Sequence, residues 1–87
     1  MIEVAVRIDV ETTPGGLLRY TFTREARTGA ERLGTVTQVA EHRWQAHAAR
    51  EQLAVATSHR SYEVAEQALM QRAGLGNSTI NYTEARA

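Results

Sequence analysis

Residues 2–11 carry a β-branched apolar side chain at every second position without a break, and no other feature constrains the fold as strongly. A period of two with β-branched side chains predicts a strand with one apolar face. The segment 12–17 contains one proline and two adjacent glycines, which favour a turn, and the alternation then resumes. We therefore expect a β-hairpin over residues 1–24, whose apolar face includes Ile2, Val4, Val6, Ile8, Leu18, Tyr20 and Phe22.

Residues 25–32 are mostly polar and have no apolar stripe, so we expect a connection there. The residues after it favour three short antiparallel strands. Pairing Val39 with Trp44 across a turn brings the large apolar side chains onto one face. That inward face holds Val39, Trp44, Ala46, Leu53 and Val55. The outward face is polar, and we expect it to bind a partner or a nucleic acid through Gln38, Arg43, Gln45, His47 and Ser58, with Arg60 nearby.

A helix is predicted to follow these strands. Ser61 suits the N-cap position, and Gly74 followed by Leu75 is typical of a left-handed C-cap. Val64, Ala65, Ala68 and Leu69 recur at helical spacing. Residues 33–75 then form a βββα unit, and residues 76–87 form a tail or a short strand. The predicted fold is a single α+β domain of the order ββ-βββα, with the helix packed on an antiparallel sheet.

The predicted helix is too narrow to cover the whole apolar face of this sheet. Five strands span about 24 Å, whereas one helix covers about 10–12 Å. The apolar face of the N-terminal hairpin therefore needs other cover. Either the sheet curls on itself, or the hairpin packs against another chain. We expect a homodimer that associates through this face.

Catalysis and metal binding find little support in the sequence. The chain has no cysteine, which excludes disulfides, thiolate nucleophiles and cysteine-ligated metals. Its three histidines, His42, His47 and His59, fall in a turn, on a strand and before the helix, so no metal-ligand spacing is evident. We expect no enzyme, no catalytic residues and no cofactor.

The composition indicates the kind of genome that encodes the protein and its location in the cell. All ten basic residues are arginine and none is lysine, which suggests the codon bias of a high-GC genome, that of an actinobacterium or one of its phages. No apolar run approaches the ~18 residues that span a bilayer. We expect a soluble cytoplasmic protein without membrane contact.

Short motifs within the βββα unit suggest one kind of partner. Gly34, the run Arg43-Trp44-Gln45-Ala46 and the run Ser61–Ala65 resemble the small β-β-β-α DNA-binding domains at the N-terminus of phage and transposon integrases. The resemblance implies that the sheet enters the major groove and reads bases with Arg43 and Gln45. The net charge is zero, however, which disfavours binding driven by phosphate contacts. We expect a host or phage protein as the partner, with DNA as the alternative.

Overall fold

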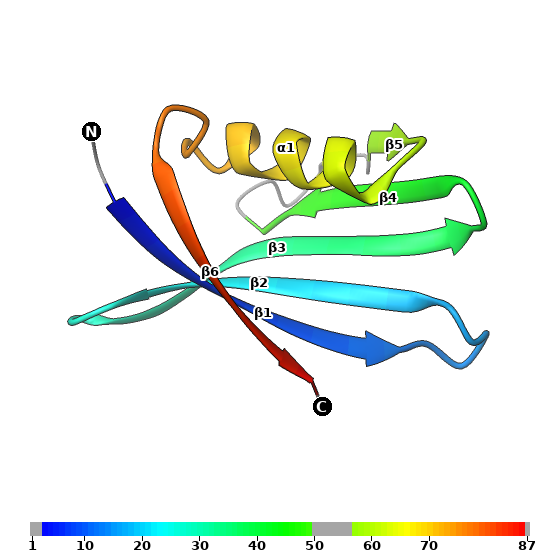
Figure 1. Ribbon diagram of the computed structural model, residues 1–87, viewed down its shortest axis with the longest axis horizontal. Helices are drawn as coiled ribbons and strands as arrows, with labels where there is room; N and C mark the ends of the chain where they lie inside the picture. Colours follow the sequence, from blue (N-terminus) through cyan, green and yellow to red (C-terminus); the bar gives the residue numbers. More distant parts are fainter. Residues whose placement is uncertain (1–2, 50–56, 87) are drawn as a thin grey trace.

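The computed structural model describes residues 3–49 and 57–86 of the chain. These residues form six strands and one helix: β1 (Glu3–Thr12), β2 (Leu18–Ala26), β3 (Gly29–Ala40), β4 (Arg43–Ala48), β5 (Thr57–His59), α1 (Tyr62–Arg72) and β6 (Thr79–Arg86). All six strands belong to one sheet in the order β5-β4-β3-β2-β1-β6 (Figure 1). The predicted α+β fold class is confirmed.

The N-terminal hairpin forms as expected, with β1 antiparallel to β2 and Val10 opposite Tyr20. The predicted connection at residues 25–32 is wrong. β2 continues to Ala26, a two-residue turn follows, and β3 begins at Gly29, whose φ is +133°. The side chains at this end of the hairpin are mostly exposed to solvent. A strand end without a buried face has no apolar alternation that could reveal it.

The register of β3 against β4 differs from the predicted one by a single residue. Gln38 lies opposite Trp44, and a bulge at Val39 separates this pair from the next. Val39 is therefore 38% exposed instead of buried. Gln38 lies on the inner face, where its side-chain oxygen accepts a hydrogen bond from the Leu18 N–H at 3.4 Å. The bulge adds one residue to β3, and one residue is enough to exchange the two faces of a strand.

The last antiparallel pair joins β4 to β5, with Gln45 opposite Ser58. The predicted register placed Gln45 beside Ala56 and differs from the observed one by two residues. A shift of two keeps each side chain on its face, so Ser58 still shares the outer face of the sheet. The predicted inward residues Leu53 and Val55 lie outside the described residues.

Both predicted ends of the helix are confirmed. The Ser61 side chain accepts a hydrogen bond from the Val64 N–H at 3.3 Å. At the other end Gly74 has φ +81°, and its N–H and that of Leu75 bond to the carbonyls of Gln71 and Met70. This pair of bonds is the Schellman motif, which ends the helix and turns the chain toward β6.

The helix lies over β3, β4 and β5, and Leu69 of the helix packs closely over Gly34 of β3. A Cβ atom at this glycine would lie 2.7 Å from Leu69 Cδ1 and 2.1 Å from the His47 carbonyl oxygen. Three aromatic rings cover the neighbouring part of this face. The ring centroid of Tyr62 lies 4.5 Å from that of Tyr20 and 5.6 Å from that of Trp44. This end of the inner face is therefore closed by the helix.

The C-terminal segment forms β6, an eight-residue strand parallel to β1. The sheet is strongly twisted, so that β1 and β6 run steeply across the direction of β3 and β4 (Figure 1). Most of the apolar hairpin residues are buried within the single chain: Val4, Val6, Ile8 and Phe22 are 0–7% exposed.

These residues are covered within the single chain, because they share one core cluster with Leu69 and Met70 of the helix and Leu75 of the turn after it. Leu18 and Tyr20 are half-buried, and Ile2 lies outside the described residues. The hairpin therefore does not present the uncovered apolar face from which we predicted self-association. The homodimer itself stays a prediction.

Candidate binding site

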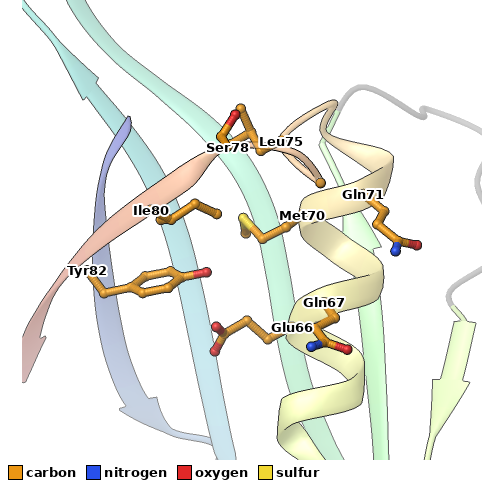
Figure 2. A pocket seen from close by; sticks show the side chains of 9 residues that line it. Glu66, Gln67, Met70, Gln71, Leu75, Ser78, Ile80 and Tyr82 are labelled. Carbon is orange, nitrogen blue, oxygen red and sulfur yellow. The ribbon is translucent and has the colours of Figure 1, made fainter. Parts of the chain in front are cut away.

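A groove of about 410 Å³ lies between α1 and β6 (Figure 2). The helix forms one wall, the strand forms the other, and the turn between them closes one end. The side chains that shape it are Glu66, Gln67, Met70 and Gln71 from the helix, Leu75 from the turn, and Ile80 and Tyr82 from the strand. None of these residues belongs to the site predicted from the sequence.

The groove exists because the helix covers only part of the sheet. Among the described residues, the backbone of α1 approaches β3, β4 and β5 but not β6. The short turn after the Schellman motif brings the chain back along the same side. Ile80 and Tyr82 are two residues apart on β6, so both side chains project toward the helix (Figure 2).

The two ends of the groove differ in polarity. At the closed end, Met70 and Leu75 are buried at 4% and 6% exposure and face the half-buried Ile80. At the other end, Glu66 carries the only carboxylate among the lining residues and points toward Tyr82 (Figure 2). The groove therefore offers an aliphatic surface beside an acidic group.

Two tyrosine hydroxyls accompany this carboxylate. Burial raises the pKa of Tyr62 well above its ordinary value, and hydrogen bonding to Glu66 and the charge of its carboxylate raise it further. The pKa of Tyr82 is raised by burial first and then by the same carboxylate. Both hydroxyls therefore remain protonated donors at neutral pH and well above it. The hydrogen bond of Tyr82 to Glu66 joins β6 to the helix, whereas that of Tyr62 to Glu66 lies within the helix.

β6 is an outermost strand of the sheet, so one of its two edges pairs with β1. Within the described part of the chain, no strand pairs with its other edge. An unpaired edge presents every second backbone N–H and C=O group for pairing with another strand. In Figure 1 the first half of β6 lies between β1 and the C-terminal end of the helix, so this edge borders the groove.

The polar site predicted from the sequence lies on the opposite face of the sheet. Arg43, Gln45 and His47 alternate along β4, and Ser58 lies opposite Gln45, so the structure brings these four together. Gln38 is not among them, because the bulge at Val39 turns it to the inner face.

Arg60 lies just beyond β5 and lines a shallow pocket of about 330 Å³ with His42, Arg43, Ser58 and His59. Charge on the outer face divides along the sheet. On β1 and β2, Arg7 lies 3.2 Å from Asp9, and Arg19 lies 3.3 Å from Glu11. Neither Arg43 nor Arg60 has an ion-pair partner among the residues that the structure describes. The end of the sheet at β4 and β5 therefore carries positive charge that no described carboxylate neutralises.

Neither a metal-ion site nor a membrane-spanning helix is found in residues 3–49 and 57–86. No group of three or more His, Cys, Asp or Glu side chains in these ranges is arranged to hold a metal ion. No helix there is long and apolar enough to cross a membrane. Comparison with family models, curated proteins and solved structures gives no significant match.

Proposed function

We propose that this protein is a non-catalytic binding protein that docks an extended segment of a protein partner along the free edge of β6. The observation that carries the proposal is the groove beside that edge, which has aliphatic side chains at its closed end and a carboxylate at the other. Strand addition of this kind takes affinity from main-chain hydrogen bonds and specificity from alternate side chains. The partner we expect is a host or phage protein in the cytoplasm.

The dimensions of the site suit such a segment. β6 has eight residues, which at about 3.3 Å per residue gives an edge about 26 Å long. A strand added at about 4.8 Å from β6 would place every second side chain in the groove, against Met70 and Ile80. The remaining side chains would point to the outer face of the sheet.

Selection from a random octapeptide library, followed by amide chemical-shift mapping, tests this proposal. We expect the selected peptides to shift the amide signals of β6 and of residues 66–71. Ile80→Lys should weaken binding more than tenfold, because it places a charge at the apolar end of the groove. The matched control is Thr21→Lys, on the outer face of β2, which should bind as the parent does. Peptides that bind without shifting β6 would overturn the proposal.

A second candidate function is nucleic-acid binding by the outer face. The observation that favours it is that Arg43, Gln45, His47 and Ser58 share this face while Arg43 and Arg60 have no ion-pair partner among the described residues. Arginine and glutamine are side chains that read guanine and adenine edges. Phosphate contacts would make the affinity for duplex DNA fall steeply with salt. Unchanged DNA affinity in the double variant Arg43→Ala, Gln45→Ala would exclude this candidate.

The homodimer is a third proposal, now resting on the free β6 edge rather than on the hairpin. A second copy carries the same edge, and two such edges could pair about a two-fold axis, in which case the second copy takes the place of the partner segment. Sedimentation equilibrium tests it: a mass twice the 9.6 kDa of the chain is expected, and a 9.6 kDa mass at all concentrations would exclude the dimer.

A further inference from the structure

We infer that the groove selects an extended segment that carries an aliphatic side chain and, two residues away, a cationic side chain. This inference rests on the strand addition proposed above and names the chemistry of the partner. It follows from three features of the groove: an aliphatic end, an acidic end, and the distance between them.

The aliphatic end can hold one side chain of moderate size. Met70 and Leu75 are almost fully buried and form its inner wall, and the half-buried Ile80 forms the opposite wall. The turn that follows the Schellman motif closes this end. A valine, isoleucine or leucine there would leave water and cover the part of Ile80 that is still exposed, which favours binding.

The acidic end favours a cation. Glu66 is the only charged group among the lining residues, and its helical neighbours in the groove, Gln67 and Gln71, are neutral amides. Glu66 is half-buried, so its carboxylate is less screened by water than the exposed carboxylates of the outer face. An arginine or lysine there would pair with the carboxylate, and the ring of Tyr82 beside it offers a further surface for the cation.

The distance between the two ends sets the spacing of the partner residues. Ile80 and Tyr82 mark the aliphatic and the acidic end, and they are two residues apart on β6. A strand added to β6 aligns with it residue by residue, and its side chains enter the groove with the same period of two. The order of the aliphatic and the cationic residue depends on whether the segment adds parallel or antiparallel.

The same features select against acidic segments. A glutamate in place of the arginine would face Glu66 in a partly buried position, where like charges repel strongly. A glutamine would lose the charge-assisted pair but keep the shape of the side chain. The groove therefore orders three otherwise equal peptides by charge alone.

Fluorescence anisotropy with capped threonine octapeptides tests this order. The probe carries one valine and one arginine two residues apart, in both orders, and it is compared with peptides in which glutamine or glutamate replaces the arginine. We expect the better arginine peptide to bind about tenfold more tightly than the glutamine peptide. The glutamate peptide should bind more weakly still.

The variant Glu66→Gln assigns the preference to one residue. It keeps the size of the side chain, and we expect it to reduce the arginine preference to less than about threefold. The matched control is Glu63→Gln, which removes the same charge from an exposed position in the first turn of the helix and should leave the preference unchanged. Amide spectra of both variants check that they are folded.

The outcomes distinguish the preference for a cation from the strand addition on which it rests. If all the peptides shift β6 amides but bind equally, the cation preference is wrong and strand addition stands. If the preference survives in Glu66→Gln, the assignment to that carboxylate is overturned. If no peptide shifts any β6 amide, both the inference and the proposed function fail.

Discussion

The inner face of this sheet is closed at one end and open at the other. Over β3 and β4 the helix rests directly on Gly34, and Val36 and Ala46 beneath it are fully buried. Beside β6 the same helix leaves a groove, and Tyr82 there remains 40% exposed. Both ends present alternate apolar side chains to the same face. Coverage by the helix therefore decides whether such residues form core or binding surface.

The closed and open ends of the inner face are expected to have different roles. The closed end holds the fully buried side chains of Leu69, Val36 and Ala46 and should contribute most to stability. The open end retains an unpaired strand edge and a single carboxylate, and should determine binding. Substitutions that follow this division are expected to separate the free energy of unfolding from the affinity for a peptide.

Replacement of Gly34 by alanine should have the largest effect. Its φ of +152° disfavours any side chain, and a Cβ there would collide with the His47 carbonyl and with Leu69. We expect a loss of about 4 kcal/mol or more of the free energy of unfolding, measured by urea denaturation. The control Gly29→Ala has φ +133° with no atom within 4 Å of the new Cβ, and should lose about 1–2 kcal/mol. Equal losses would show that the His47 carbonyl and Leu69 do not crowd the position of a Cβ atom at Gly34.

Truncation of one aliphatic side chain at each end gives the next largest effect. Leu69→Ala empties a fully buried position and should cost about 3 kcal/mol. Ile80→Ala removes a half-buried side chain from the groove and should cost about 1 kcal/mol, while weakening peptide binding. Urea denaturation compares the two. A cost at Ile80 as large as that at Leu69 would mean that the groove is part of the core.

Sequence reasoning located the elements whose signals are local. The hairpin alternation, the Ser61 cap and the Gly74 cap each involve a few neighbouring residues, and all three predictions are confirmed. The bulge at Val39 was missed, because the register that buried the most apolar surface was one residue away from the observed one. The strand ends around Arg27 were missed because they carry no apolar stripe.

The candidate groove could not be predicted from the sequence for a different reason. Glu66 and Tyr82 are far apart in the chain, and they meet only because β6 adds to β1 at the far side of the sheet. Ile80 and Tyr82 alternate with polar residues, which is the one signal in the sequence, and it indicates a strand but not the place of that strand in the sheet. Four of the predicted outer-face residues lie together on that face: Arg43, Gln45, His47 and Ser58. Gln38 lies on the inner face instead.

Alkaline pH should lower the free energy of unfolding. The pKa values of Tyr62 and Tyr82 are raised in the folded chain, whereas both should lie near 10 in the unfolded chain. Stability should therefore be independent of these groups below about pH 10 and should fall as the pH rises beyond it. Urea denaturation at pH 8 to 11 measures the slope. The double variant Tyr62→Phe, Tyr82→Phe should reduce it, and an unchanged slope would contradict the account.

The ion pairs of the outer face should have the smallest effect on either end. Arg19 and Glu11 lie 3.3 Å apart but are both about half exposed. Arg19→Gln should change the free energy of unfolding by less than about 1 kcal/mol and leave peptide affinity unchanged. A larger change in denaturation experiments would show that the outer face also supports the fold.

Amide hydrogen exchange of β6 shows whether its free edge accepts a strand. With a saturating concentration of the valine- and arginine-containing octapeptide, we predict that alternate amides of residues 79–86 exchange at least about tenfold more slowly, while those of β3 are unchanged. Alternate protection is the signature of one newly paired edge. Tight peptide binding with no slowing of exchange in β6 would contradict strand addition at this edge.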